Sequence, residues 1–65
     1  MKFTIEVGRS GAGGRDEVLY RVTADEISPK RIKVRAEQLF QLWRDRGATS
    51  ARVLNANGEE LYVVP

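Results

Sequence analysis

The fold follows from residues 28–47, SPKRIKVRAEQLFQLWRDRG, which carry the signals of one amphipathic helix. Ser28 is placed to act as the N-cap, because its hydroxyl can accept hydrogen bonds from the first free amides. Pro29 suits the first helical position, where no partner for a backbone N–H is needed. Gly47 suits the left-handed residue that closes a helix. We therefore expect one helix between Ser28 and Gly47.

The apolar residues of this helix fall in one stripe when each residue is turned by about 100°. The stripe comprises Ile32, Ala36, Leu39 and Trp43, with Phe40 on one border and Arg35 and Leu42 on the other. Trp43 lies at core spacing, which favours a packing role over a ligand platform. A helix with a single apolar stripe is not stable alone in water, so the stripe predicts a sheet beneath it.

Four strands are expected from alternating apolar and polar residues. They cover residues 2–7, 17–23, 49–55 and 59–64. The glycine-rich segment Gly8–Asp16 is interpreted as a loose hairpin loop. The order is ββαββ, and we expect an α+β fold of one domain, residues 1–65, whose four-stranded sheet carries the helix on one face. The strand order is not determined by the sequence.

The second hairpin turns at Asn57 and Gly58, and it allows two registers. A two-residue turn sets Val53 opposite Tyr62. A three-residue loop that ends on Gly58 sets Val53 opposite Leu61 instead. We prefer the second register, because it keeps one apolar face toward the helix.

One face of the predicted sheet is left uncovered by the helix. Its expected residues are Lys2, Thr4, Glu6, Leu19, Arg21, Arg52, Leu54, Tyr62 and Val64. Apolar side chains beside arginines exceed what a purely solvated face requires, and such a patch is typical of a contact surface.

The same element order, with the Ser28-Pro29 helix start and the closing hairpin Val53–Tyr62, resembles several small bacterial domains of unknown function. The resemblance implies a small ββαββ fold of bacterial origin. Those families have no assigned functional residues, so it implies no site.

Composition excludes several classes of protein. There are no cysteines and no histidines, which removes disulfides and the common zinc clusters. No apolar run is long enough to span a bilayer, and we expect a cytoplasmic protein. Ser10 and Ser50 have no evident base, so we expect no enzyme, no cofactor and no metal.

The leading hypothesis is a non-catalytic module that forms a homodimer or docks a protein partner, through the open sheet face or an edge strand. The residues expected to bind the partner are Leu19, Arg21, Arg52, Leu54 and Tyr62.

The alternative hypothesis is a nucleic-acid-binding module that uses the sheet face, where a base stacks on Tyr62. The basic residues expected on that face are Lys2, Arg21 and Arg52. The net charge of +2 permits such contact without demanding it. The expected phosphate contacts are Arg9, Arg15, Lys30, Arg31 and Lys33. Backbone amides of the loop around Gly11–Gly14 could form an anion nest. The loop matches no phosphate-binding motif, which favours a plain connection.

Overall fold

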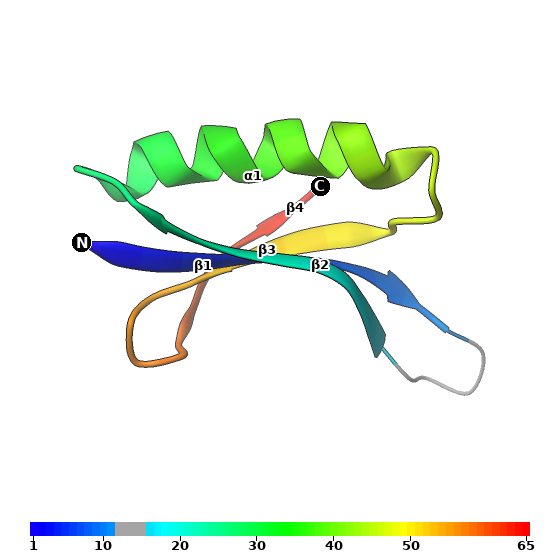
Figure 1. Ribbon diagram of the computed structural model, residues 1–65, viewed down its shortest axis with the longest axis horizontal. Coiled ribbons are helices and arrows are strands. Elements are labelled where there is room, and N and C mark those ends of the chain that lie inside the picture. Colours follow the sequence, from blue (N-terminus) through cyan, green and yellow to red (C-terminus); the bar gives the residue numbers. More distant parts are fainter. Residues whose placement is uncertain (12–15) are drawn as a thin grey trace.

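The computed structural model, which describes residues 1–11 and 16–65, has two layers: a four-stranded sheet and a helix lying along one of its faces (Figure 1). The elements are β1 (Lys2–Ser10), β2 (Asp16–Asp25), α1 (Pro29–Arg44), β3 (Ser50–Leu54) and β4 (Glu60–Val64). The predicted α+β fold with ββαββ order is confirmed. The strands lie in the order β2-β1-β3-β4 with every neighbouring pair antiparallel, so β2 and β4 are the edges.

Both ends of α1 follow the sequence signals. The Ser28 hydroxyl accepts a hydrogen bond from the Arg31 N–H at 3.4 Å. Gly47 has a φ of +100°, and the Ala48 N–H donates back to the Trp43 carbonyl at 3.2 Å. A left-handed glycine with this return hydrogen bond satisfies carbonyls that the last helical turn leaves free.

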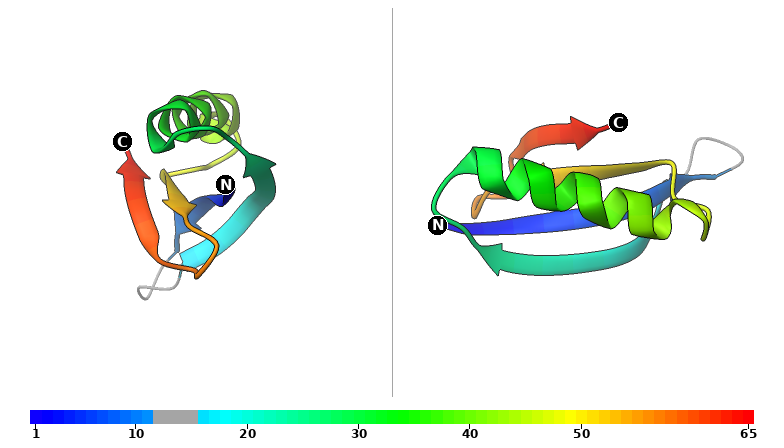
Figure 2. Two further views of the ribbon diagram at one scale, coloured as in Figure 1. Left: turned by 90° about the vertical axis from the view of Figure 1, so that its left-hand side faces the viewer. Right: turned by 90° about the horizontal axis from the view of Figure 1, so that it is seen from above.

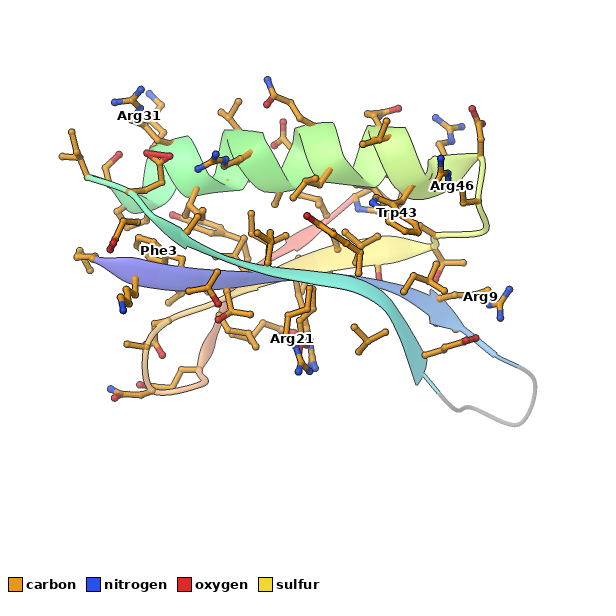
Figure 3. All side chains as sticks on the ribbon, in the orientation of Figure 1. Phe3, Arg9, Arg21, Arg31, Trp43 and Arg46 are labelled. Atoms are coloured by element: carbon orange, nitrogen blue, oxygen red, sulfur yellow. The ribbon has the colours of Figure 1, made fainter. Side chains whose placement is uncertain are left out.

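The core lies between α1 and the central strands. Its buried residues are Phe3, Ile5, Val7, Ile32, Ala36, Phe40, Ala48, Ala51, Val53 and Val64. Phe3 and Trp43 both point into the space between helix and sheet (Figure 3). Trp43 is half-buried at the border of this core, where it stacks on Tyr20 with ring centroids 5.3 Å apart. The packing role expected for Trp43 is therefore observed at the margin of the core.

The first hairpin is longer than the sequence predicted. The segment assigned to a loop from Gly8 onward begins as strand, because residues 8–10 belong to β1 and pair with β2. Arg9 forms an ion pair with Glu17 across the two strands. The Ser10 N–H also donates to the Thr49 hydroxyl at 2.9 Å, which ties the end of the strand to the segment before β3.

A β-bulge places side chains of β2 on different faces of the sheet from those that the sequence predicted. Val7 pairs with Tyr20 and Gly8 with Val18, so Leu19 is the extra residue. Past a bulge the alternation of side chains shifts by one. Leu19, expected on the open face, packs against the core instead, and Val18 lines the open face.

A second bulge gives β4 a different register from the one that the sequence predicted. The three-residue loop is confirmed near the turn, because the Asn55 N–H donates to the Glu59 carbonyl at 2.9 Å and Leu54 pairs with Glu60. Leu61 is then the extra residue, and Val53 pairs with Tyr62, so the preferred pairing with Leu61 is wrong.

This shift moves Tyr62 and Val64 from the open face, where they were expected, to the helix side. Val64 keeps 6% of its surface exposed there, whereas Leu61 remains 40% exposed. The bulge lets Tyr62 and Val64 pack against the core, which removes their apolar surface from water.

Candidate functional site

The centre of the open sheet face is a carboxylate held by two arginines. Glu6, on β1, keeps 5% of its surface exposed. One of its oxygens accepts from Arg21 Nε on β2 and the other from Arg52 Nε on β3, both at 2.7 Å. Arg21 points away from the helix (Figure 3). These hydrogen bonds join three strands across the face.

The pKa of Glu6 reflects two opposing effects. Burial alone would raise the pKa, because it disfavours the charged carboxylate. The hydrogen bonds and positive charges of Arg52 and Arg21 outweigh burial and hold the pKa of Glu6 below its ordinary value. Glu6 is therefore ionised at neutral pH and neutralises charge that the two arginines would otherwise present to a partner.

The open face is balanced in charge. In the part of this face spanned by residues 2–6 of β1, strand pairing places the cations Lys2, Arg21 and Arg52 and the acids Glu6, Asp25 and Glu60, three of each. A face with no net charge attracts neither a polyanion nor an acidic protein by long-range electrostatics.

The structure brings together part of the predicted partner site. Arg21 and Arg52 meet at Glu6, and Leu54 lies half-buried on the same face opposite Thr4. Leu19 and Tyr62 are on the helix side. Arg21 and Arg52 form ion pairs with Glu6. Of the apolar residues expected on the open face, Leu54 is the one that lies there.

Most predicted phosphate contacts already have partners. Arg9 pairs with Glu17, Arg31 lies 3.9 Å from Glu26, and the Lys33 ammonium lies 5.4 Å from the centre of the Tyr62 ring. Lys30 is exposed, and Arg15 lies outside the described residues. These cations are spread over the hairpin end and the helix rather than gathered in one patch.

The two edges of the sheet differ in how open they are. β4 is five residues long and is interrupted by the bulge at Leu61. β2 is ten residues long, and from Tyr20 to Asp25 it runs without a bulge. α1 packs over β1, β3 and β4, and seen from above it lies to one side of β2 (Figure 2). Edge strands are usually protected by shortness, bulges, a cover or charged side chains. Of these, this part of β2 has only the charged residues Arg21 and Asp25.

An apolar groove runs beside this edge, between β2 and α1. Its apolar lining comes from Tyr20, Val22 and Ala24 on β2 and from Leu39 and Leu42 on α1. Polar residues also line it, namely Thr23, Asp25, Arg35 and Gln38. The groove encloses about 630 Å³, and Leu42 is 67% exposed. Sequence reasoning missed this groove. The sequence feature that could have revealed it is Leu42, an apolar residue at the border of the helical stripe, where the core does not bury it.

Comparison with protein-family models, curated proteins and solved structures finds no match to this chain. The suggested likeness to small bacterial domains stays a prediction. In the described part of the chain, α1 lacks both the length and the apolar character to cross a membrane. Within residues 1–11 and 16–65, no three potential ligand side chains are grouped to hold a metal ion.

Proposed function

We propose that this chain is a non-catalytic interaction module that binds an extended protein segment along the free edge of β2. The observation that carries this proposal is an edge without bulge or cover, Tyr20–Asp25, that lies directly beside a groove with apolar walls. A strand that presents unpaired backbone N–H and C=O groups is a template for another strand.

The backbone and the side chains of β2 contribute to the proposed binding in different ways. Backbone hydrogen bonds along the edge supply affinity without regard to sequence, and pockets for alternate side chains supply specificity. Every second residue of the bound segment faces the groove formed with Leu39 and Leu42, so these residues are apolar. The residues between them face the side of Arg21 and Asp25, so these residues are polar or charged.

The edge is better supported than the open face as the contact surface. Arg21 and Arg52 each donate Nε to Glu6, and this carboxylate offsets charge that a partner on the open face would otherwise meet. Binding at the edge does not depend on these charged side chains, because the strand itself presents its backbone groups outward.

Nucleic-acid binding has less support. The expected stacking residue, Tyr62, faces α1 and lies under Lys33. We expect amide shifts caused by oligonucleotides at low salt to vanish at physiological salt, as electrostatic background contacts do.

The proposal is tested by amide-shift NMR with a set of extended peptides whose residues alternate between apolar and polar. Binding shifts amides of β2 and of α1 around Leu42. Leu42→Glu weakens these shifts because it places a charge in the groove, whereas Val34→Glu leaves them unchanged. Val34 is a suitable control because it is also an exposed apolar helix residue, at 49%, but lies outside the groove. Shifts that avoid β2, or that respond equally to both variants, contradict the proposal.

A further inference from the structure

We infer that the strand bound at this edge is β2 of a second copy of the chain, antiparallel to the first and related to it by a two-fold axis at Thr23. This inference rests on the proposed function, because it uses the same edge. A two-fold interface must be self-complementary, since the same patch meets itself. The residues of β2 can be checked against that requirement.

The sheet face on which each β2 side chain lies restricts the register of such a pair. Residues directly opposite in a sheet share a face. Tyr20, Val22 and Ala24 face α1, and Arg21, Thr23 and Asp25 face the open side. The two copies can therefore be centred only on a residue opposite itself, and not between two residues.

Charge selects among the centres. A pair centred on Arg21 sets two arginines directly opposite, which is unfavourable. A pair centred on Val22 sets Arg21 opposite Thr23. A pair centred on Thr23 sets Arg21 of each copy opposite Asp25 of the other, which makes two opposite-charge pairs by one rotation. Thr23 is thus the complementary centre.

Both charged groups are available for this contact. The side chain of Arg21 is 60% exposed and that of Asp25 is 72% exposed. Arg21 contacts Glu6 through Nε and Nη2, and its guanidinium carries further donors on Nη1. Within residues 1–11 and 16–65, the ion pair of Asp25 is a distant one, 3.8 Å from the Met1 amino group.

The same register joins the two apolar grooves. With Thr23 on the axis, Val22 of each copy lies opposite Ala24 of the other, on the face toward the helices. The floor of the groove then continues from one copy to the next, with a Leu42 at each side. The arrangement accounts for the exposed Leu42 and the uncovered β2 with a single contact.

Cysteine cross-linking tests the register, because the chain has no cysteine of its own. Residues directly opposite in antiparallel strands have Cα atoms about 4.5 to 5.5 Å apart, within the range that a disulfide spans. Thr23→Cys forms a disulfide-linked dimer under mild oxidation. Asn57→Cys, in the exposed turn of the other hairpin, stays monomeric. Efficient cross-linking of Val22→Cys, or equal cross-linking of Asn57→Cys, overturns the register.

Charge at the axis provides a second test by sedimentation equilibrium. Thr23 is exposed, so lysine or glutamate is accommodated in a single copy. Thr23→Lys or Thr23→Glu alone weakens the dimer by about tenfold, since like charges meet at the axis, and mixing the two variants restores association. If the chain stays monomeric at all concentrations while extended peptides shift β2, this inference fails and the proposed function stands. If neither occurs, both fail.

Discussion

Replacing Glu6 by glutamine should lower the free energy of unfolding by about 2 kcal/mol at neutral pH. Glutamine keeps the size of the side chain but removes the charge that holds Arg21 and Arg52. It also places an amide N–H₂ group against one of the two guanidinium groups. The substitution therefore isolates the ion pair that ties three strands together.

The size of this loss in unfolding free energy depends on how exposed the three side chains are. A hydrogen bond to a charged group contributes about 1.5 to 3 kcal/mol. Glu6 is nearly buried, but the side chains of Arg21 and Arg52 are 60% and 50% exposed, so solvent weakens each interaction to about 1 kcal/mol. Two such interactions give the loss of about 2 kcal/mol, which for a domain of this size corresponds to about 10 °C in Tm.

Urea unfolding of dilute protein, followed by Trp43 fluorescence at pH 7 and pH 3, measures this loss. Because folding lowers the pKa of Glu6, its stabilisation is complete above about pH 4.3, the ordinary value for glutamate, and is lost as the pH falls through the folded-state pKa. The difference between wild type and Glu6→Gln should therefore shrink at pH 3.

Glu60→Gln is the control for this prediction. Glu60 is 49% exposed and 4.0 Å from Arg52, and its loss should cost less than about 0.5 kcal/mol. A Glu6→Gln loss no larger than that of the control, or a loss equal at both pH values, would refute the reasoning.

Other substitutions test the two bulges and the helix end by urea unfolding. Gly8→Ala should cost about 1 kcal/mol, because the added Cβ would lie 3.0 Å from the Glu17 carbonyl oxygen; unchanged stability would contradict the close approach. Tyr62→Asp should cost about 2 kcal/mol or more and Leu61→Asp less than about 1 kcal/mol; the reverse order would contradict the register of β4. Gly47→Ala should cost about 1 kcal/mol, because alanine disfavours the positive φ, and a gain in stability would contradict the helix closure.

The helix and the element order could be predicted because their signals are local. Ser28, Pro29 and Gly47 act within one turn of the helix, and the stripe from Ile32 to Trp43 repeats often enough to identify its period. The three-residue loop at Gly58 is equally local, since it depends on a residue with positive φ, here +84°.

The facing of β2 and β4 could not be predicted, because a bulge is decided by contacts between distant residues. Leu19 and Leu61 look like ordinary members of alternating strands. Each is the extra residue at a register shift against the neighbouring strand, and this pairing joins residues far apart in the sequence. Two of the five expected partner residues, Leu19 and Tyr62, changed face for this reason.

The groove depends on the strand order. Sequence alone left the order open, so it could not tell which strand would lie beyond the cover of α1. Val22 and Leu39 carried strong burial patterns, and only the placement of β2 at the edge leaves their side chains beside an open groove. The sequence places Leu42 at the border of the helical stripe, but it does not show which strand lies beside it.

Amide hydrogen exchange at low and high protein concentration tests the use of the β2 edge most directly. If β2 pairs with a second copy, the outward-facing amides among Tyr20–Asp25 exchange more slowly as concentration rises, while those of β4 are unchanged. Exchange in β2 that is independent of concentration, together with no protection on adding extended peptides, would contradict the assignment of this edge as the interaction surface.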